Sequence, residues 1–396
     1  MVATNENESK LPLAGVVVLD LTWLLPGPFC THILKELGAE VIKVEKPEGG
    51  DYLRDLLPEA YMLINRGKKS IAIDLKTQHG RNEFEYLVRE CDVIVESFRP
   101  GVAQRLEVDY DRLSSHNPSL IYLSISGYGQ TGPLASVAGH DINYLALAGA
   151  LSIPAHWGES PRRSGLPMAD LAASLYGAIN VVAALRTRDV NGNGEYIDLS
   201  IAESVLHWTQ VRFADHAESC DGTYGWNHVW PGNDVFTTKD RRHLALGIVE
   251  EKFWKNFGAA AQWREAASMA ETFECARCEQ SRQIAGNLLR EQVSARIAEH
   301  DIQHWLHVLA EHDVPHSSIN DKTGVFREPQ FLSRDAWEEI PGQNQSSIKA
   351  VNLPGTVFRG ARGRAPRLDE HGSQLRARFP NDLREQTVLS EKGSST

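Results

Sequence analysis

VVVLDLTWLLPGPFCTHILKELGAEVIKVE, residues 16–45, contains two β-branched runs on either side of one helical pattern. The runs Val16–Asp20 and Val41–Glu45 carry apolar residues at successive positions, which is typical of strands buried on both faces. Between them the pattern predicts a helix over Pro28–Leu37, and Gly38 is placed to end it. A strand, a helix and a second strand in this order form a βαβ unit with parallel strands.

The same alternation continues through the first half of the chain. Further strands are expected over 71–75, 93–95, 120–124 and 196–201, and helices over 78–90 and 169–188. Strands that alternate with helices predict the α/β class, with a parallel sheet covered by helices on both faces.

The pattern changes after about residue 225. A strand is expected over His243–Ile248, and the residues from Glu251 to Leu309 are mostly helical, with amphipathic stripes. We therefore predict a smaller α+β domain over 225–325. The polar tail after about residue 385 is expected to be frayed.

Composition excludes several classes of protein. The 396 residues include 41 Lys and Arg against 52 Asp and Glu, a net charge of −11, which argues against a sequence-independent nucleic-acid binder. Residues 1–10 are polar, and no apolar run reaches the roughly 18 residues of a membrane span, so neither secretion nor a membrane is expected.

The cysteines predict neither a disulfide framework nor a zinc site. The five cysteines are odd in number and scattered, which predicts reduced thiols and a cytoplasmic protein; they are Cys30, Cys91, Cys220, Cys275 and Cys278. Cys275 and Cys278 have CxxC spacing, but no second CxxC completes a zinc site, so no metal is expected.

Two loops place cations beside a glycine next to a strand, at 65–70 and 97–101. Such loops suit phosphate recognition, but the surrounding acids balance the bases, so the residues alone favour solvated loop charges. No GxGxxG, Walker or GxSxG motif is present, which argues against dinucleotide-binding, P-loop and α/β-hydrolase enzymes.

Three positions near helix starts could carry acid–base chemistry. His140 with Asp141 could be a positioned general base, although an N-capping Asp141 beside a structural His140 explains the pair more simply. Asp170 opens a long helix, where it is either a cap or a carboxylate beside free amides able to hold an oxyanion. Glu250 begins a helix and could serve only its dipole.

Several longer motifs in the same order resemble the family III CoA-transferase (CaiB/BaiF) superfamily, from Leu13 to about Leu368. They are PGPFC at 26–30, GAEVIKVE at 38–45, RGKKS at 66–70 and SGYGQTGP at 126–133. Within the superfamily, AGHDINYLAL at 138–147 is most similar to α-methylacyl-CoA racemase.

The resemblance implies an interlocked homodimer with a Rossmann-like large domain and a small domain in each subunit. Residues 1–224 and the returning segment 326–396 would build the large domain around the small domain at 225–325. Each active site would be shared between the two subunits. The substrate would be an acyl-CoA, so coenzyme A arrives with the substrate and no cofactor is held permanently.

The resemblance also implies roles for individual residues. In racemases of this type His140 and Asp170 would be the acid–base pair, Asp141 would orient His140, and Glu250 would support them. Coenzyme A would meet a further set of side chains: Lys43, Lys69, Ser97, Phe98, Arg99, Arg105 and Tyr144.

The function therefore has three candidates. The presence of His140 favours a 2-methylacyl-CoA racemase that moves the α-proton through an enolate. The alternative is a CoA-transferase that forms acyl anhydrides on Asp170, as the Leu171-Ala172-Ala173-Ser174 run suggests, and as does Leu166 where racemases usually have Asn. A CoA-binding protein without catalysis is the third candidate.

Overall fold

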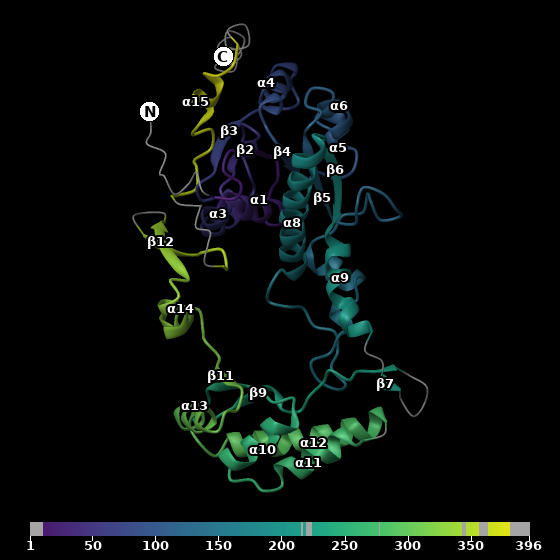
Figure 1. Ribbon diagram of the computed structural model, residues 1–396, viewed down its shortest axis with the longest axis vertical. Helices are drawn as coiled ribbons and strands as arrows, with labels where there is room; N and C mark the ends of the chain where they lie inside the picture. Colours follow the sequence, from purple (N-terminus) through teal and green to yellow (C-terminus); the bar gives the residue numbers. More distant parts are fainter. Residues whose placement is uncertain are drawn as a thin grey trace. The chain divides into compact units, whose positions relative to one another are not determined.

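The computed structural model describes residues 11–214, 217–218, 224–276, 278–342, 346–355 and 363–380. The chain divides into two compact units, which we call the large unit and the small unit (Figure 1). The large unit contains Met1–Ala150, Arg163–Trp208 and Ser333–Thr396, and the small unit contains Leu151–Arg162 and Thr209–Leu332. The small domain that the sequence predicted, 225–325, is shorter than this small unit and lacks its segment Leu151–Arg162. The predicted frayed tail lies outside the described residues.

A six-stranded parallel sheet forms the centre of the large unit, in the order β3-β2-β1-β4-β5-β6. Its strands are β1 (Val17–Asp20), β2 (Glu40–Glu45), β3 (Lys69–Ala72), β4 (Val93–Glu96), β5 (Ile121–Ser126) and β6 (Glu195–Ser200). The predicted α/β fold with a Rossmann-like parallel sheet is confirmed. The strand order reverses between β1 and β4, which is where open parallel sheets bind ligands.

Helices cover both faces of this sheet because alternate strand residues point to opposite sides. Helices α1 (Pro26–Glu36) and α8 (Met168–Asn191) pack together on one face. On the other face Leu19 and Ile94 pack with residues of α4 (Gln78–Arg89). The remaining helices of this unit are short, except for α9, whose residues continue into the small unit; they are α2 (Leu53–Leu56), α3 (Pro58–Ile64), α5 (Val102–Arg105), α6 (Tyr110–Ser114), α7 (Asp141–Leu147), α9 (Ile201–Phe213) and α15 (Gly372–Arg376).

The C-terminal residues pack on the edge strand β3 of the large unit. Asp369 Oδ1 accepts a hydrogen bond from the Ala72 amide at 2.8 Å, and Arg376 Nε donates to Glu83 Oε1 at 2.9 Å. The β12–β13 hairpin (Trp337–Pro341 and Ser347–Val351) precedes this segment. Both ends of the chain therefore contribute to one unit.

The small unit combines an antiparallel sheet with a helical layer. Strands β9 (Asn233–Thr237), β10 (His243–Gly247) and β11 (His316–Ser318) pair in the order β11-β10-β9. Trp254, Phe257 and Trp305 are large side chains that are fully buried in its core. The other elements are α10 (Glu251–Ala260), α11 (Ala266–Glu274), α12 (Glu279–Ile297), α13 (Ile302–Glu311), α14 (Pro329–Ser333, which reaches the boundary), and strands β7 (Ala217–Glu218) and β8 (Tyr224–Gly225).

The structure bears on two expectations from the sequence. Helix α8 has the length and apolar composition of a membrane-crossing helix, although its sequence holds no unbroken apolar run of about 18 residues. Half of that stretch is buried, and the helix packs on α1, β5 and β6, as core helices do. Cys278 is disulfide-bonded rather than a free thiol, whereas Cys275 is free and exposed.

Candidate active site

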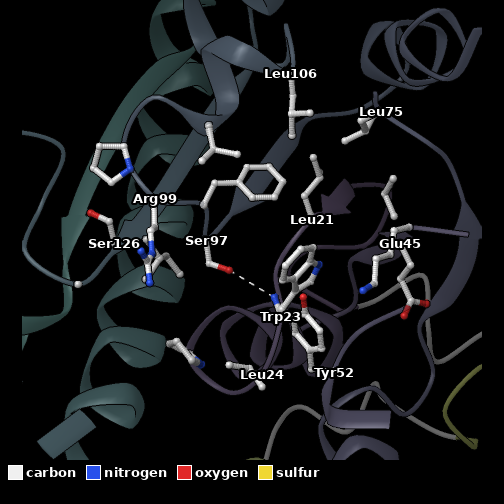
Figure 2. Close-up of a pocket in the computed structure, with 18 of the residues that line it drawn as sticks. Leu21, Trp23, Leu24, Glu45, Tyr52, Leu75, Ser97, Arg99, Leu106 and Ser126 are labelled. Atoms are coloured by element: carbon white, nitrogen blue, oxygen red, sulfur yellow. Dashed lines mark hydrogen bonds between the residues drawn. The ribbon is translucent and has the colours of Figure 1, made fainter. Parts of the chain in front are cut away.

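A pocket of about 1190 Å³ lies along the carboxyl edge of the large unit's sheet (Figure 2). Its lining comes from the loops that follow β1, β2, β3, β4 and β5, and thus includes the β1–β4 switch point. Figure 2 shows Trp23, from the loop after β1, beside Ser97, from the loop after β4; the Trp23 amide donates to Ser97 Oγ at 3.3 Å. The sheet topology places a ligand site here.

The pocket is long because it extends along the sheet edge. Asp170, His140 and Tyr144 line it together with Ser126 of β5, whereas Lys76 and Arg81 line it beyond β3. Four strand intervals separate β3 from β5, which corresponds to about 19 Å at the usual strand spacing. The pocket therefore has a carboxylate end near β5 and a cationic end near β3.

The Asp170 carboxylate enters the pocket from the first turn of α8. No described residue donates a hydrogen bond to it. Burial, followed by the nearby charge of Asp141, raises the pKa of Asp170 to about 7. A carboxylate without donors and with a raised pKa is a stronger base and nucleophile than an ordinary aspartate.

Asp141 binds the start of α8. Its Oδ1 accepts hydrogen bonds from the amides of Ala169 at 2.7 Å and Asp170 at 3.4 Å. Asp141 therefore caps α8, a helix that starts far along the chain from it, and its orientation of His140 stays a prediction. The same bonds engage the two amides that were expected to be free to hold an oxyanion.

His140 and Tyr144 belong to α7, on the same side of the pocket as Asp170. His140 is the exposed N-cap residue of α7, and its amide donates to Asn143 Oδ1 at 3.0 Å. Tyr144 is buried, and its hydroxyl donates to the Gly139 carbonyl at 2.7 Å. The structure thus brings His140, Tyr144 and Asp170 to one pocket, as the sequence suggested.

The predicted coenzyme-binding residues divide into two groups. Ser97, Phe98, Arg99 and Arg105 line the pocket. Lys43 does not: its side chain is fully buried, with Nζ 2.8 Å from the Thr22 carbonyl and 3.0 Å from Asp51 Oδ2. An ammonium that is already paired inside the protein is not available to a phosphate, so this prediction is corrected.

Lys69 is also absent from the pocket lining, because its Nζ pairs with Glu40 Oε1 on the neighbouring strand at 2.6 Å. Two other lysines line the pocket and were missed: Lys46 and Lys76. Lys46 directly follows β2, and its Nζ lies 4.4 Å from the centroid of the Tyr52 ring. The position after a predicted strand was the signal that could have identified both lysines.

Glu250 belongs to the small unit. It is the N-cap residue of α10, and its carbonyl accepts a hydrogen bond from the Phe253 amide at 3.0 Å. Its support of an acid–base pair stays a prediction. Within the described part of the chain, no group of three or more His, Cys, Asp or Glu side chains could hold a metal ion.

Comparisons of the sequence and the structure with known proteins all identify the same family. The model of CoA-transferase family III matches residues 13–372. An acetyl-CoA:oxalate CoA-transferase from Acetobacter aceti is 31% identical over 394 residues, 96% of this chain and 98% of that protein. Human succinyl-CoA:glutarate CoA-transferase is 31% identical over 366 residues, 88% of this chain and 80% of that protein. A crystal structure of a CaiB/BaiF family protein from Brucella suis has a TM-score of 0.78 and 28% identity, covering 93% of this chain and 99% of that one.

Proposed function

This chain belongs to CoA-transferase family III, and we propose that it transfers coenzyme A from an acyl-CoA to a carboxylic acid with Asp170 as the nucleophile. The observation that carries the proposal is the Asp170 carboxylate, which enters the long pocket with no described donor bound to it. The relatives from Acetobacter aceti and human carry CoA-transferase names.

The chemistry needs only a carboxylate and the two substrates. Asp170 attacks the thioester carbonyl, so that an acyl–aspartyl anhydride forms and the CoA thiolate leaves. The thiolate then attacks the aspartyl carbonyl, which releases the first acid and leaves CoA on Asp170 as a thioester. The second acid attacks this thioester through its carboxylate, and the displaced thiolate finally attacks the new acyl group. Asp170 is regenerated as a carboxylate.

The shape of the pocket supports this proposal. Coenzyme A is an extended molecule with phosphates at one end and its thiol at the other, and the pocket extends about 19 Å from β3 to β5. We propose that Lys46, Lys76 and Arg105 meet the phosphates. With the phosphates at that end, the thioester would lie beside Asp170.

A racemase is the second candidate, because His140 lines the same pocket as Asp170. Against it, Asp141 already binds the amides expected to hold the enolate. The test is to incubate the protein with a chiral 2-methylacyl-CoA in deuterated water, and separately with an acyl-CoA and a second acid. Transfer without α-deuterium supports the proposal, whereas α-deuterium without transfer supports the racemase.

The rate of transfer should depend on the protonation of Asp170. Because the pKa of Asp170 is about 7 and the carboxylate is the reactive form, kcat/KM should fall about tenfold per pH unit below pH 7 and be level above it. Initial rates between pH 5 and 9 measure this profile.

Asp141→Asn is the matched variant for the pH profile. Its amide oxygen can still accept from Ala169 and Asp170, but the negative charge that helps to raise the pKa of Asp170 is gone. The acid limb should therefore move to lower pH, and it should remain above pH 4 because burial, the larger cause, is unchanged. If the acid limb of the pH profile stays at the same pH in Asp141→Asn, the limb does not report the titration of Asp170.

We also propose that the protein is a homodimer, as the resemblance implied. The support is a row of exposed apolar side chains on α8, namely Leu175, Ile179 and Val182, of which Ile179 is 60% exposed. Such rows usually mark an interface. Sedimentation should give twice the mass of the chain, and a monomer at micromolar concentration would overturn the proposal. The predicted cytoplasmic location stays a prediction.

A further inference from the structure

The Asp170 carboxylate is positioned through the backbone of its own helical turn. No described residue donates a hydrogen bond to its oxygens, so no such bond fixes the direction in which they point. The backbone, by contrast, is bound, because Asp141 Oδ1 accepts from the Ala169 and Asp170 amides at 2.7 and 3.4 Å. The place of the nucleophile therefore depends on how the first turn of α8 is fixed.

Ser174 binds the same turn from α1. Its Oγ lies 2.7 Å from the Asp170 carbonyl oxygen, four residues earlier on α8, and 2.7 Å from the Pro26 carbonyl oxygen at the start of α1. The first contact is one that helical serines often make, whereas the second joins two helices, and the single hydroxyl proton is shared between them. Ser174 is completely buried, so water does not compete for its hydroxyl. The hydroxyl thus bridges the turn of the nucleophile to a second helix.

Pro26 is a fixed point because buried side chains hold the loop before it. Lys43 Nζ donates to the Thr22 carbonyl at 2.8 Å, and Asp51 Oδ1 accepts from the Leu24 amide at 3.0 Å. Leu24 has a φ of 64°, in the left-handed region that a bulky residue adopts only where its surroundings impose it. The serine bridge therefore attaches the first turn of α8 to a rigidly held segment of the large unit.

We propose that Ser174 is a positioning residue for Asp170: its hydroxyl ties the turn of the nucleophile to the start of α1, so that the carboxylate meets the thioester carbonyl in one place. This inference rests on the proposed CoA transfer and adds to it a residue that is not part of the pocket lining. A displacement of about 1 Å between reacting groups can cost about 100-fold in rate. Loss of the bridge should therefore act on kcat and leave the binding of coenzyme A unchanged.

The test measures kcat for CoA transfer and the KM of the acyl-CoA. Ser174→Ala should lower kcat about 10-fold and change KM less than about twofold. Ser174→Cys keeps a weak donor of similar size, so its kcat should lie between those of Ser174→Ala and the wild type. Ser204→Ala is the matched control, since Ser204 is also a buried serine whose Oγ donates to a carbonyl four residues earlier, that of Ser200 at 2.9 Å. It should leave kcat and KM unchanged. Circular dichroism and thermal unfolding establish that each variant folds.

Each outcome has a distinct meaning. If Ser174→Ala loses thermal stability but keeps the kcat of the wild type, the hydroxyl is only structural and the inference is wrong, while CoA transfer itself stands. If Ser174→Ala raises KM and keeps kcat, the serine shapes the binding of coenzyme A, and the inference is again wrong. Should Ser174→Ala not fold, the same split between kcat and KM is measured for Ser174→Cys against the wild type. If the wild type transfers CoA to no carboxylic acid, the proposed function fails, and this inference fails with it.

Discussion

Replacing Asp170 by alanine is expected to lower kcat for CoA transfer by at least about 10⁴-fold, because the reaction then has no carboxylate to form the anhydride. Transfer of CoA from an acyl-CoA to a carboxylic acid, followed by chromatography of both thioesters, measures the loss. Binding of the acyl-CoA should change by only a few fold, since Asp170 reacts with the thioester and contributes little to holding coenzyme A.

Asp74→Ala is the control for this experiment. Asp74 is another carboxylate in the pocket lining, but it lies beyond β3, and its Oδ1 accepts from the Lys76 amide at 3.0 Å. Asp74→Ala should lower kcat for CoA transfer far less than Asp170→Ala does. An Asp170→Ala enzyme that keeps a tenth of the wild-type rate would remove Asp170 from the mechanism.

Asp20→Ala should reduce the free energy of unfolding by about 3–5 kcal/mol, because it leaves the buried ammonium of Lys68 without a carboxylate partner. Asp20 is completely buried at the end of β1. Its Oδ2 lies 3.0 Å from Lys68 Nζ and 3.9 Å from Lys43 Nζ, and both ammonium groups are also fully buried. Lys43 Nζ in turn donates to the Thr22 carbonyl, so the cluster also holds the loop that lines the pocket. Urea unfolding of both proteins measures the difference.

Lys252→Ala is the matched control for stability. The Lys252–Asp313 pair has a similar separation, 2.7 Å, but both side chains are exposed, so its removal should cost at most about 1 kcal/mol. If Asp20→Ala and Lys252→Ala reduce the free energy of unfolding equally, the buried cluster around Asp20 does not stabilise the fold more than an exposed ion pair does.

The stability contributed by Asp20 should also depend on pH. Burial alone would raise the pKa of Asp20, but Lys43, Lys68 and the hydroxyls of Thr22 and Thr31 together hold it well below its usual range. A carboxyl with a lowered pKa stabilises the fold above its unfolded pKa of about 4 and loses this contribution in more acidic solution. The difference between wild type and Asp20→Ala should therefore shrink below about pH 4.

Local patterns were sufficient for the sheet, since runs such as Val16–Asp20 and Val41–Glu45 are buried on both faces and read as strands without knowledge of their partners. The interior of β2 contains Lys43, and a lysine inside such a strand is a sign of burial and pairing rather than of phosphate binding. Its partners, Asp20 and Asp51, come from other parts of the chain and could not be found from local sequence.

The site was predictable as a set of positions but not as a set of contacts. His140 and Asp170 line one pocket, as the motifs suggested, because both stand at helix starts on one edge of the sheet. That Asp141 caps α8 depends on two helices whose starts meet only in the folded chain. Local sequence reasoning assigns a cap to its own helix, and here that assumption was wrong.

The central claim is that Asp170 carries coenzyme A during transfer, and mass spectrometry of the enzyme tests it directly. The protein is incubated with an acyl-CoA, quenched in acid so that thioesters survive, and digested with pepsin. The peptide that contains Asp170 should carry coenzyme A as a thioester in the wild type and should carry none in Asp170→Ala. The contrary result is a peptide that is never modified, in an enzyme that nevertheless places deuterium at the α-carbon of a 2-methylacyl-CoA in deuterated water.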